Sequence, residues 1–203
     1  TVEIGLLSNG FGSITIGKAD SGAVTISAIT FNDPITILGA AMSVTALQAA
    51  ANNITLTSTS TIDELADNNT TDITTSGTLA LTAQGAIGAA GATGALDLAV
   101  GTLQATTASG GIFVLESSGL IVGGSGVNTS AGSAEIQITL TAGNLTLEDD
   151  ITADGSGNVT LVLSAASAQL ITGEAADDIV SGTGDILITA DVLTLVGGNI
   201  TSA

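Results

Sequence analysis

The sequence predicts an all-β protein folded as a parallel β-solenoid (β-helix), and three observations support this prediction. Short strands in which apolar residues flank Thr recur along the chain. Gly, Asn and Asp turns separate these strands. Hydrophobic residues make up 44% of the 203 residues but aromatic ones only 1%, so the core must consist of thin aliphatic layers.

Five triplets in the first 58 residues define a repeat of about ten residues. They are ITI at 14–16, VTI at 24–26, ITI at 35–37, VTA at 44–46 and ITL at 54–56. Their first residues follow one another at intervals of 10, 11, 9 and 10 residues. Each triplet has the period of two that is typical of a strand, and the regular spacing predicts a repeat architecture.

Two local features bear on these first strands. Helix propensity competes in segment 40–51, which is rich in Ala, Met, Leu and Gln. We nevertheless predict a strand at 44–47, because it falls on the ten-residue repeat. Pro34 stands at the first position of a strand, where its missing N–H does least harm.

The alternation continues less evenly in the rest of the chain. It returns at 79–81, 96–98, 113–115, 136–140, 145–147, 159–163, 186–188 and 193–195. Between these strands, segment 59–77 is polar and segment 85–94 is rich in Gly and Ala. We therefore predict one elongated solenoid over residues 1–203, with irregular loops near 59–77 and 85–94.

Strands this short cannot each bury a face as an isolated sheet, which favours stacking. Coils of roughly 20 residues, each with two or three strands, would pair in parallel at about 4.8 Å and align their Ile, Val and Leu side chains. This predicts about ten coils in a rod on the order of 45 Å long. The alternative is an antiparallel β-sandwich, which also uses short alternating strands but usually has aromatic residues in its core.

Segments 77–117 and 143–165 resemble the internal repeats of filamentous-haemagglutinin-like giant exoproteins, which are secreted bacterial surface proteins. The resemblance implies a right-handed parallel β-helix that forms a long stalk, located outside the cell or on the bacterial surface, with a role in adhesion or surface structure. The family's N-terminal secretion signatures, Asn-Pro-Asn-Leu and Asn-Pro-Asn-Gly, do not occur in the sequence. We therefore expect an internal or processed piece of such a protein.

Composition argues against several classes of function. The chain has one basic residue, Lys18, against 19 acidic ones, which argues against binding to nucleic acid or anionic lipid. It has no His, Cys, Tyr or Arg, so the common nucleophilic and metal-assisted catalytic sites cannot be built. No run of about 18 apolar residues indicates a membrane span. We predict no enzyme, no cofactor, and no catalytic or metal-binding residue.

Two acidic clusters deserve comparison with calcium sites. The first contains Asp149, Asp150, Asp154 and Asn158, and the second contains Glu174, Asp177, Asp178 and Asp185. Calcium prefers such oxygen ligands, but the spacing matches neither the EF-hand nor the nonapeptide of calcium-binding solenoids. Solvated acidic turns are the prediction, and calcium binding is the alternative.

Asn and Thr also permit two interpretations each. Asn-x-Ser/Thr sequons begin at Asn53, Asn68, Asn69, Asn128, Asn144, Asn158 and Asn199. They are either glycosylation sites or turn-forming Asn residues that precede a strand, and we favour the second. Outward Thr residues 15, 25, 36, 45, 55, 146, 160 and 194 would suit an ice-binding face, but Thr is also a common exposed strand residue.

The function predicted from the sequence is a structural or adhesive module, a rigid stalk or fibre subunit of a bacterial surface or extracellular filament. Its expected partners are further copies joined end to end, or flanking repeats of a longer chain. The alternative is an extracellular module that binds calcium or glycans of the host or environment through segments 59–77 and 148–158. Ice binding is a less favoured alternative.

Overall fold

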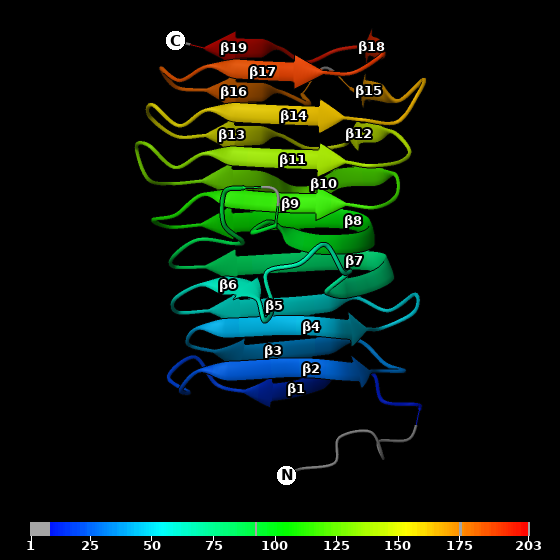
Figure 1. The fold of residues 1–203 in the computed structure, drawn as a ribbon, viewed down its shortest axis with the longest axis vertical. Helices are drawn as coiled ribbons and strands as arrows, with labels where there is room; N and C mark the ends of the chain where they lie inside the picture. Colours follow the sequence, from blue (N-terminus) through cyan, green and yellow to red (C-terminus); the bar gives the residue numbers. More distant parts are fainter. Residues whose placement is uncertain (1–8, 92, 175, 203) are drawn as a thin grey trace.

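The computed structural model describes residues 9–91, 93–174 and 176–202. Its strands stack as a parallel β-solenoid of about 8 turns, which confirms the predicted fold class (Figure 1). All the strand pairs within these ranges are parallel, which rules out the antiparallel sandwich. No helix in the described ranges is long and apolar enough to cross a membrane. The right-handed sense of the solenoid stays a prediction.

The strands in chain order are β1 (Ile14–Gly17), β2 (Val24–Thr30), β3 (Ile35–Gly39), β4 (Met42–Gln48), β5 (Ile54–Ser58), β6 (Ile62–Glu64), β7 (Ile73–Ala83), β8 (Leu96–Thr107), β9 (Ile112–Glu116), β10 (Leu120–Thr129), β11 (Ile136–Leu140), β12 (Leu145–Leu147), β13 (Ile151–Ala153), β14 (Val159–Leu163), β15 (Gln169–Thr172), β16 (Ile179–Ser181), β17 (Ile186–Thr189), β18 (Val192–Leu195) and β19 (Ile200–Ser202).

The core is a set of aliphatic ladders that run along the solenoid axis. Ile14 of β1 pairs with Ile35 of β3, which pairs with Ile54 of β5, and Ile54 pairs with Leu79 of β7. Ile35, Ile54 and Leu79 are at most 1% exposed. Burial of successive layers by their neighbours is how a thin aliphatic core becomes continuous.

The residues between these inward positions face outward, as the alternation predicts. Thr15 pairs with Thr36 and Thr36 with Thr55, which forms a short Thr ladder. The ladder ends at the next coil, where Thr55 pairs with Ala80. An ice-binding face built on this column would therefore be interrupted after three coils.

The early coils contain two main strands and the later coils three. In the C-terminal part, β12, β13 and β14 pair with β15, β16 and β17 respectively. Coils of this kind are longer: Leu120 pairs with Leu145, and the side chain of Asn144 meets Gln169 25 residues further along the chain. The solenoid consequently has about 8 turns rather than the predicted ten.

Two local predictions can be compared with the strands. Segment 40–51 forms β4, so the predicted strand is confirmed and helix propensity does not prevail there. The segment 59–77, expected to be a loop, contains β6 and the start of β7. The stacked coils on either side provide pairing partners for these residues, which local polarity does not reveal.

Candidate functional site

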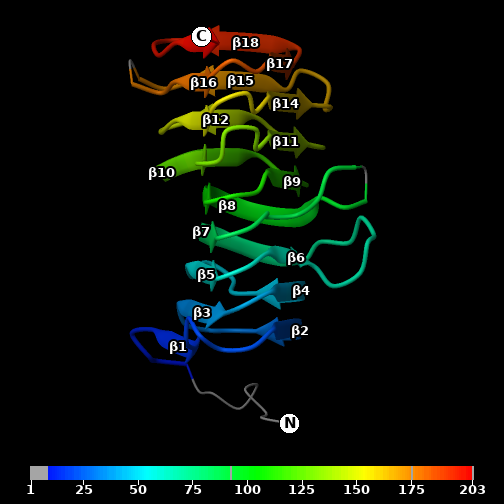
Figure 2. The ribbon, with the colours of Figure 1, turned by 90° about the vertical axis from the view of Figure 1, so that its left-hand side faces the viewer.

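Two insertions leave the solenoid at the same corner of successive coils. In the coil that contains β4, the strand runs without a break from Val44 to Leu47. On the next coil, Glu64 pairs with Val44 and Ile73 pairs with Leu47. Residues 65–72 therefore take the place of the two residues between Val44 and Leu47. In the coil after that, Ile87 pairs with Ile62 and Leu98 with Ile73, with a second insertion between them. Figure 2 shows both loops projecting from one side of the solenoid.

The base of these insertions brings together three carboxylates, Glu64, Asp72 and Asp97, here called the carboxylate triad. One oxygen from each lies within 4.8 Å of the others. Strand pairing fixes two of them: the Asp72 N–H donates to the Asp97 carbonyl at 2.8 Å, and the Asp97 N–H donates to Asp72 Oδ2 at 3.2 Å. The backbone therefore holds Asp72 and Asp97 side by side on adjacent coils.

Burial leaves part of the carboxylate triad without hydrogen-bond donors. Asp72 and Asp97 are 2% and 4% exposed, whereas Glu64 is half-buried. Glu64 Oε2 accepts the Asn68 N–H at 3.2 Å, but Glu64 Oε1 and Asp97 Oδ2 are buried and accept no hydrogen bond. Among the described residues, these two are the buried side-chain nitrogen or oxygen atoms that lack a hydrogen-bond partner. Each such oxygen costs roughly 1–3 kcal/mol, and more when it is charged.

The shared environment raises the pKa of all three acids. Burial raises the pKa of Asp97 to about 6. Burial raises the pKa of Asp72 to about 6, aided by the charges of Asp97 and Asp63 and opposed by the Asp97 N–H. Burial also raises the pKa of Glu64 to about 7, opposed by the Asn68 N–H and aided by the neighbouring carboxyl group of Asp67 and the charges of Asp72 and Asp97. These carboxylates are therefore poised to gain a proton or a cation near neutral pH.

Among the described residues, no basic side chain lies beside the carboxylate triad. Lys18 is the one basic side chain of the sequence, and its Nζ lies 3.1 Å from Asp20 Oδ1, in an exposed ion pair. A cavity of about 170 Å³ adjoins Asp97 and is bounded by Asn69 and Thr71 of the first insertion. The carboxylate triad thus combines uncompensated charge, shielded oxygens and an adjacent space.

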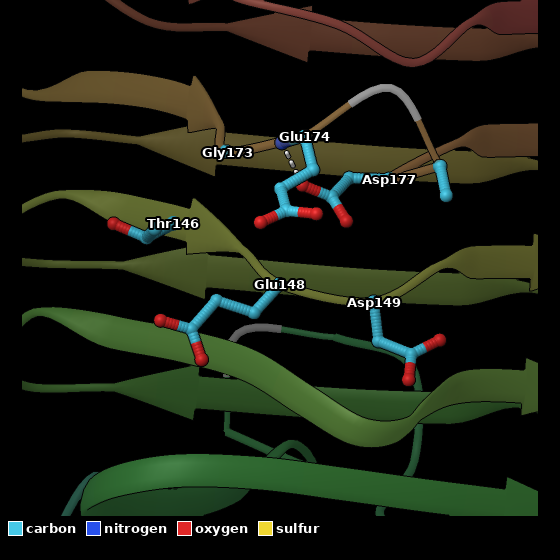
Figure 3. Close-up of a pocket in the computed structure, with 7 residues that line it drawn as sticks. Thr146, Glu148, Asp149, Gly173, Glu174 and Asp177 are labelled. Carbon is cyan, nitrogen blue, oxygen red and sulfur yellow. Dashed lines mark hydrogen bonds between the residues drawn. The ribbon is translucent and has the colours of Figure 1, made fainter.

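The acidic clusters predicted from the sequence lie elsewhere, on the turns of the C-terminal coils. Glu148 and Asp149 follow β12, and Glu174 and Asp177 follow β15, so coil stacking brings them to one groove of about 560 Å³ (Figure 3). Asp177 Oδ2 accepts the Glu174 N–H. No Phe of the described chain lines this groove, so it has no aromatic platform for a sugar ring.

The other members of these clusters serve the backbone. Asp150 Oδ1 accepts the Asp178 N–H at 2.8 Å, and Asp178 Oδ1 accepts the Asn199 N–H at 2.6 Å. Asp154 and Asp185 lie on separate turns, outside the groove. Stacking therefore joins parts of the two predicted clusters. Glu148 and Glu174 are exposed there, whereas Asp177 is buried and accepts a backbone N–H.

The turn-forming Asn residues play a similar part. The side-chain oxygens of Asn53, Asn144 and Asn158 accept N–H groups of the next coil, from Thr78, Gln169 and Asp185, at 2.8–3.0 Å. These three sequon residues thus tie successive coils together. Their glycosylation stays a separate hypothesis.

The sequence prediction missed the carboxylate triad, although all its members lie in or next to segments that it singled out. Its one visible signal is the separation of 25 residues between Asp72 and Asp97, which equals the length of a coil. It also missed Glu116, a fully buried carboxylate that accepts the N–H groups of Val100 and Ser118 at 3.0 and 2.8 Å.

The described coils and their stacked turns define the class of this protein as a parallel β-solenoid. Comparison with known proteins finds no matching family model, curated protein or solved structure. Function is therefore inferred from the geometry of the solenoid itself.

Proposed function

We propose that this chain is a structural module, a rigid stalk or fibre segment of a bacterial surface or extracellular filament. The observation that carries the proposal is the apolar face of the last described coil. Leu193 and Leu195 of β18 are 50% exposed and Ile200 of β19 is 38% exposed, although all three occupy inward positions.

The equivalent positions one coil below show what this face lacks. Leu170 pairs with Leu193 and Ile179 pairs with Ile200, and both Leu170 and Ile179 are fully buried. A further coil stacked on β17, β18 and β19 would bury the exposed side chains and pair the open strand edges in the same way. We propose that this coil comes from flanking repeats of a longer chain or from a second copy joined end to end.

The rest of the solenoid suits mechanical continuity. Parallel pairing extends from β1 to β19, and the aliphatic ladders run through the successive coils. A load along the axis would therefore be distributed over several columns of strand contacts. The resemblance of segments 77–117 and 143–165 to filamentous-haemagglutinin-like repeats supports an extracellular setting and an adhesive role. The absence of His, Cys, Tyr and Arg supports a role without catalysis.

Small-angle scattering and electron microscopy over a range of protein concentrations test this proposal. We expect elongated particles whose length increases with concentration as apolar end faces meet. Leu193→Lys should abolish the increase, because it places a charge on the end face. Leu187→Lys is the matched control: Leu187 is 56% exposed on the same coil but pairs with Thr160 in an outward column.

Two results would refute the proposal. One is a compact monomer that stays monomeric at high concentration and gains no thermal stability when flanking sequence is added. The other is a concentration-dependent association that Leu193→Lys and Leu187→Lys alter equally.

A further inference from the structure

We infer that the carboxylate triad of Glu64, Asp72 and Asp97 is a calcium-binding site that fastens the first insertion, residues 65–72, to the solenoid. This site is independent of end-to-end association and goes beyond the structural role proposed above. Its position also differs from that of the two acidic clusters that the sequence brought forward.

The ligand chemistry selects a hard cation. All three groups offer carboxylate oxygens, and the chain has no His or Cys that would favour zinc or another softer metal. Calcium binds oxygen at about 2.3–2.6 Å, so two ligands on opposite sides of the ion lie about 4.6–5.2 Å apart. One oxygen from each acid lies within 4.8 Å of the others, so a single calcium ion could contact all three. Magnesium usually keeps several water molecules and is bound through only one or two carboxylates, so three protein carboxylates favour calcium.

The unpartnered oxygens are a separate indication of a ligand. Asp97 is only 4% exposed, and its Oδ2 atom accepts no hydrogen bond. Glu64 Oε1 is shielded and unpartnered in the same cluster. Buried carboxylates are normally paired or bound to metal, because an isolated buried charge is costly. A bound cation would satisfy both oxygens together.

The contrast with the acidic turns shows why this cluster is distinct. The carboxylates of Asp150, Asp177 and Asp178 all accept backbone N–H groups. In the triad, one oxygen of Asp72 and one of Glu64 also accept backbone N–H groups, but Glu64 Oε1 and Asp97 Oδ2 are buried without any donor. Of the three acids, Asp97 alone also lines the cavity of about 170 Å³, which could hold water molecules on that side of the triad.

Binding here would have a defined structural effect. Glu64 is the last residue of β6 before the first insertion, Asp72 immediately precedes β7, and Asp97 lies in β8 on the next coil. A single ion would therefore close the two ends of the insertion and tie them to the neighbouring coil. The cation would therefore stabilise the corner of the solenoid at which the insertion separates β6 from β7.

Calcium titration of the chelator-stripped full chain by isothermal calorimetry tests the inference. We expect one calcium site, a higher melting temperature in calcium than in EGTA, and weaker binding of magnesium. Asp97→Asn should reduce calcium affinity at least tenfold and abolish the calcium-dependent rise in melting temperature. Asp154→Asn makes the same change of charge on an exposed turn and should leave both unchanged.

The melting temperature in EGTA shows whether the Asp97→Asn variant still folds without calcium. Because Asp97→Asn removes a buried charge, it should melt no lower than the wild type in EGTA. The inference is overturned if the wild type shows neither calcium binding nor a calcium-dependent shift. It is also overturned if Asp97→Asn and Asp154→Asn behave alike, or if magnesium binds as tightly as calcium.

Discussion

Replacing Asp97 by Asn should stabilise the calcium-free solenoid at pH 8. Asp97 is 4% exposed, and burial raises its pKa from the ordinary value of 3.8 to about 6. At about 1.4 kcal/mol per pH unit, this difference in pKa corresponds to about 3 kcal/mol against the ionised folded state. Asn carries no charge, so the variant should recover up to about 3 kcal/mol in the free energy of unfolding.

The sign of the effect fixes its pH dependence. A carboxyl whose pKa is higher in the folded state binds more protons there, so its contribution to stability is fully present below the unfolded value of 3.8 and is lost as the pH rises through about 6. The advantage of Asp97→Asn should therefore be near zero below pH 4, grow between pH 4 and 6, and level off above pH 7. Asp72 and Glu64, whose pKa values are raised to about 6 and 7, should make the wild type lose stability over the same range and slightly above it.

Urea unfolding followed by far-ultraviolet circular dichroism in EGTA, at pH 4, 6 and 8, measures this difference. Asp154→Asn, on an exposed turn, should follow the wild type at all three pH values. A variant Asp97→Asn that is less stable than the wild type at pH 8 would refute the reasoning, because it would show that the ionised carboxylate is stabilising in its buried position. A pH-independent gain would refute the assignment to titration.

Three further substitutions test other parts of the fold. Gly88→Ala should destabilise the solenoid by about 2 kcal/mol, because Gly88 has φ +63° and an added Cβ would overlap the Phe113 carbonyl oxygen. Gly22→Ala is the control: an added Cβ there meets no neighbouring atom, so the urea midpoint should change little. Glu116→Ala should cost about 2–4 kcal/mol in the same assay, since it leaves two N–H groups without their carboxylate acceptor. Asn158→Ala should cost about 1 kcal/mol by removing the acceptor of the Asp185 N–H, and a cost near zero would show that the bond between these coils contributes nothing.

The fold was predictable because its signal is local and repeated. At the first three positions of β1, β3 and β5, an outward Thr lies between two inward Ile or Leu residues, and stacking pairs these positions with one another. The later coils were harder to read because their strands are short or interrupted. β13 has three residues, and the Gly-Gly-Ser-Gly run at 123–126 in β10 breaks the period of two. Coil length, and with it the number of turns, depends on these less visible strands.

The carboxylate triad could not be found in the same way. Glu64 and Asp72 flank an insertion, and Asp97 is contributed by a different coil, so no short motif contains all three. Their proximity follows from pairing Asp72 with Asp97 across 25 residues, and this register is known only once Ile73 is matched to Leu98. Side-chain burial is a further property that the sequence hides: Asp97 occupies an outward position of its strand, yet it is covered.

The solenoid satisfies most of its acidic turns without basic side chains, and this explains why the carboxylate triad is exceptional. Where coils stack regularly, the N–H groups of one coil meet the carboxylates of the coil before it, as in the series Asp150, Asp178 and Asn199. Near Asp97, the N–H groups of the next coil have other acceptors. The Ser117 N–H donates to the Leu98 carbonyl at 2.9 Å, and the Ser118 N–H donates to the Glu116 carboxylate. The chain has a single Lys and no Arg or His, so it has few basic side chains that could pair with a buried carboxylate. The buried carboxylates beside the inserted loop must therefore be neutralised by protons or by a cation from solution. The acidic composition thereby links the stability of this corner to the ionic environment of the protein.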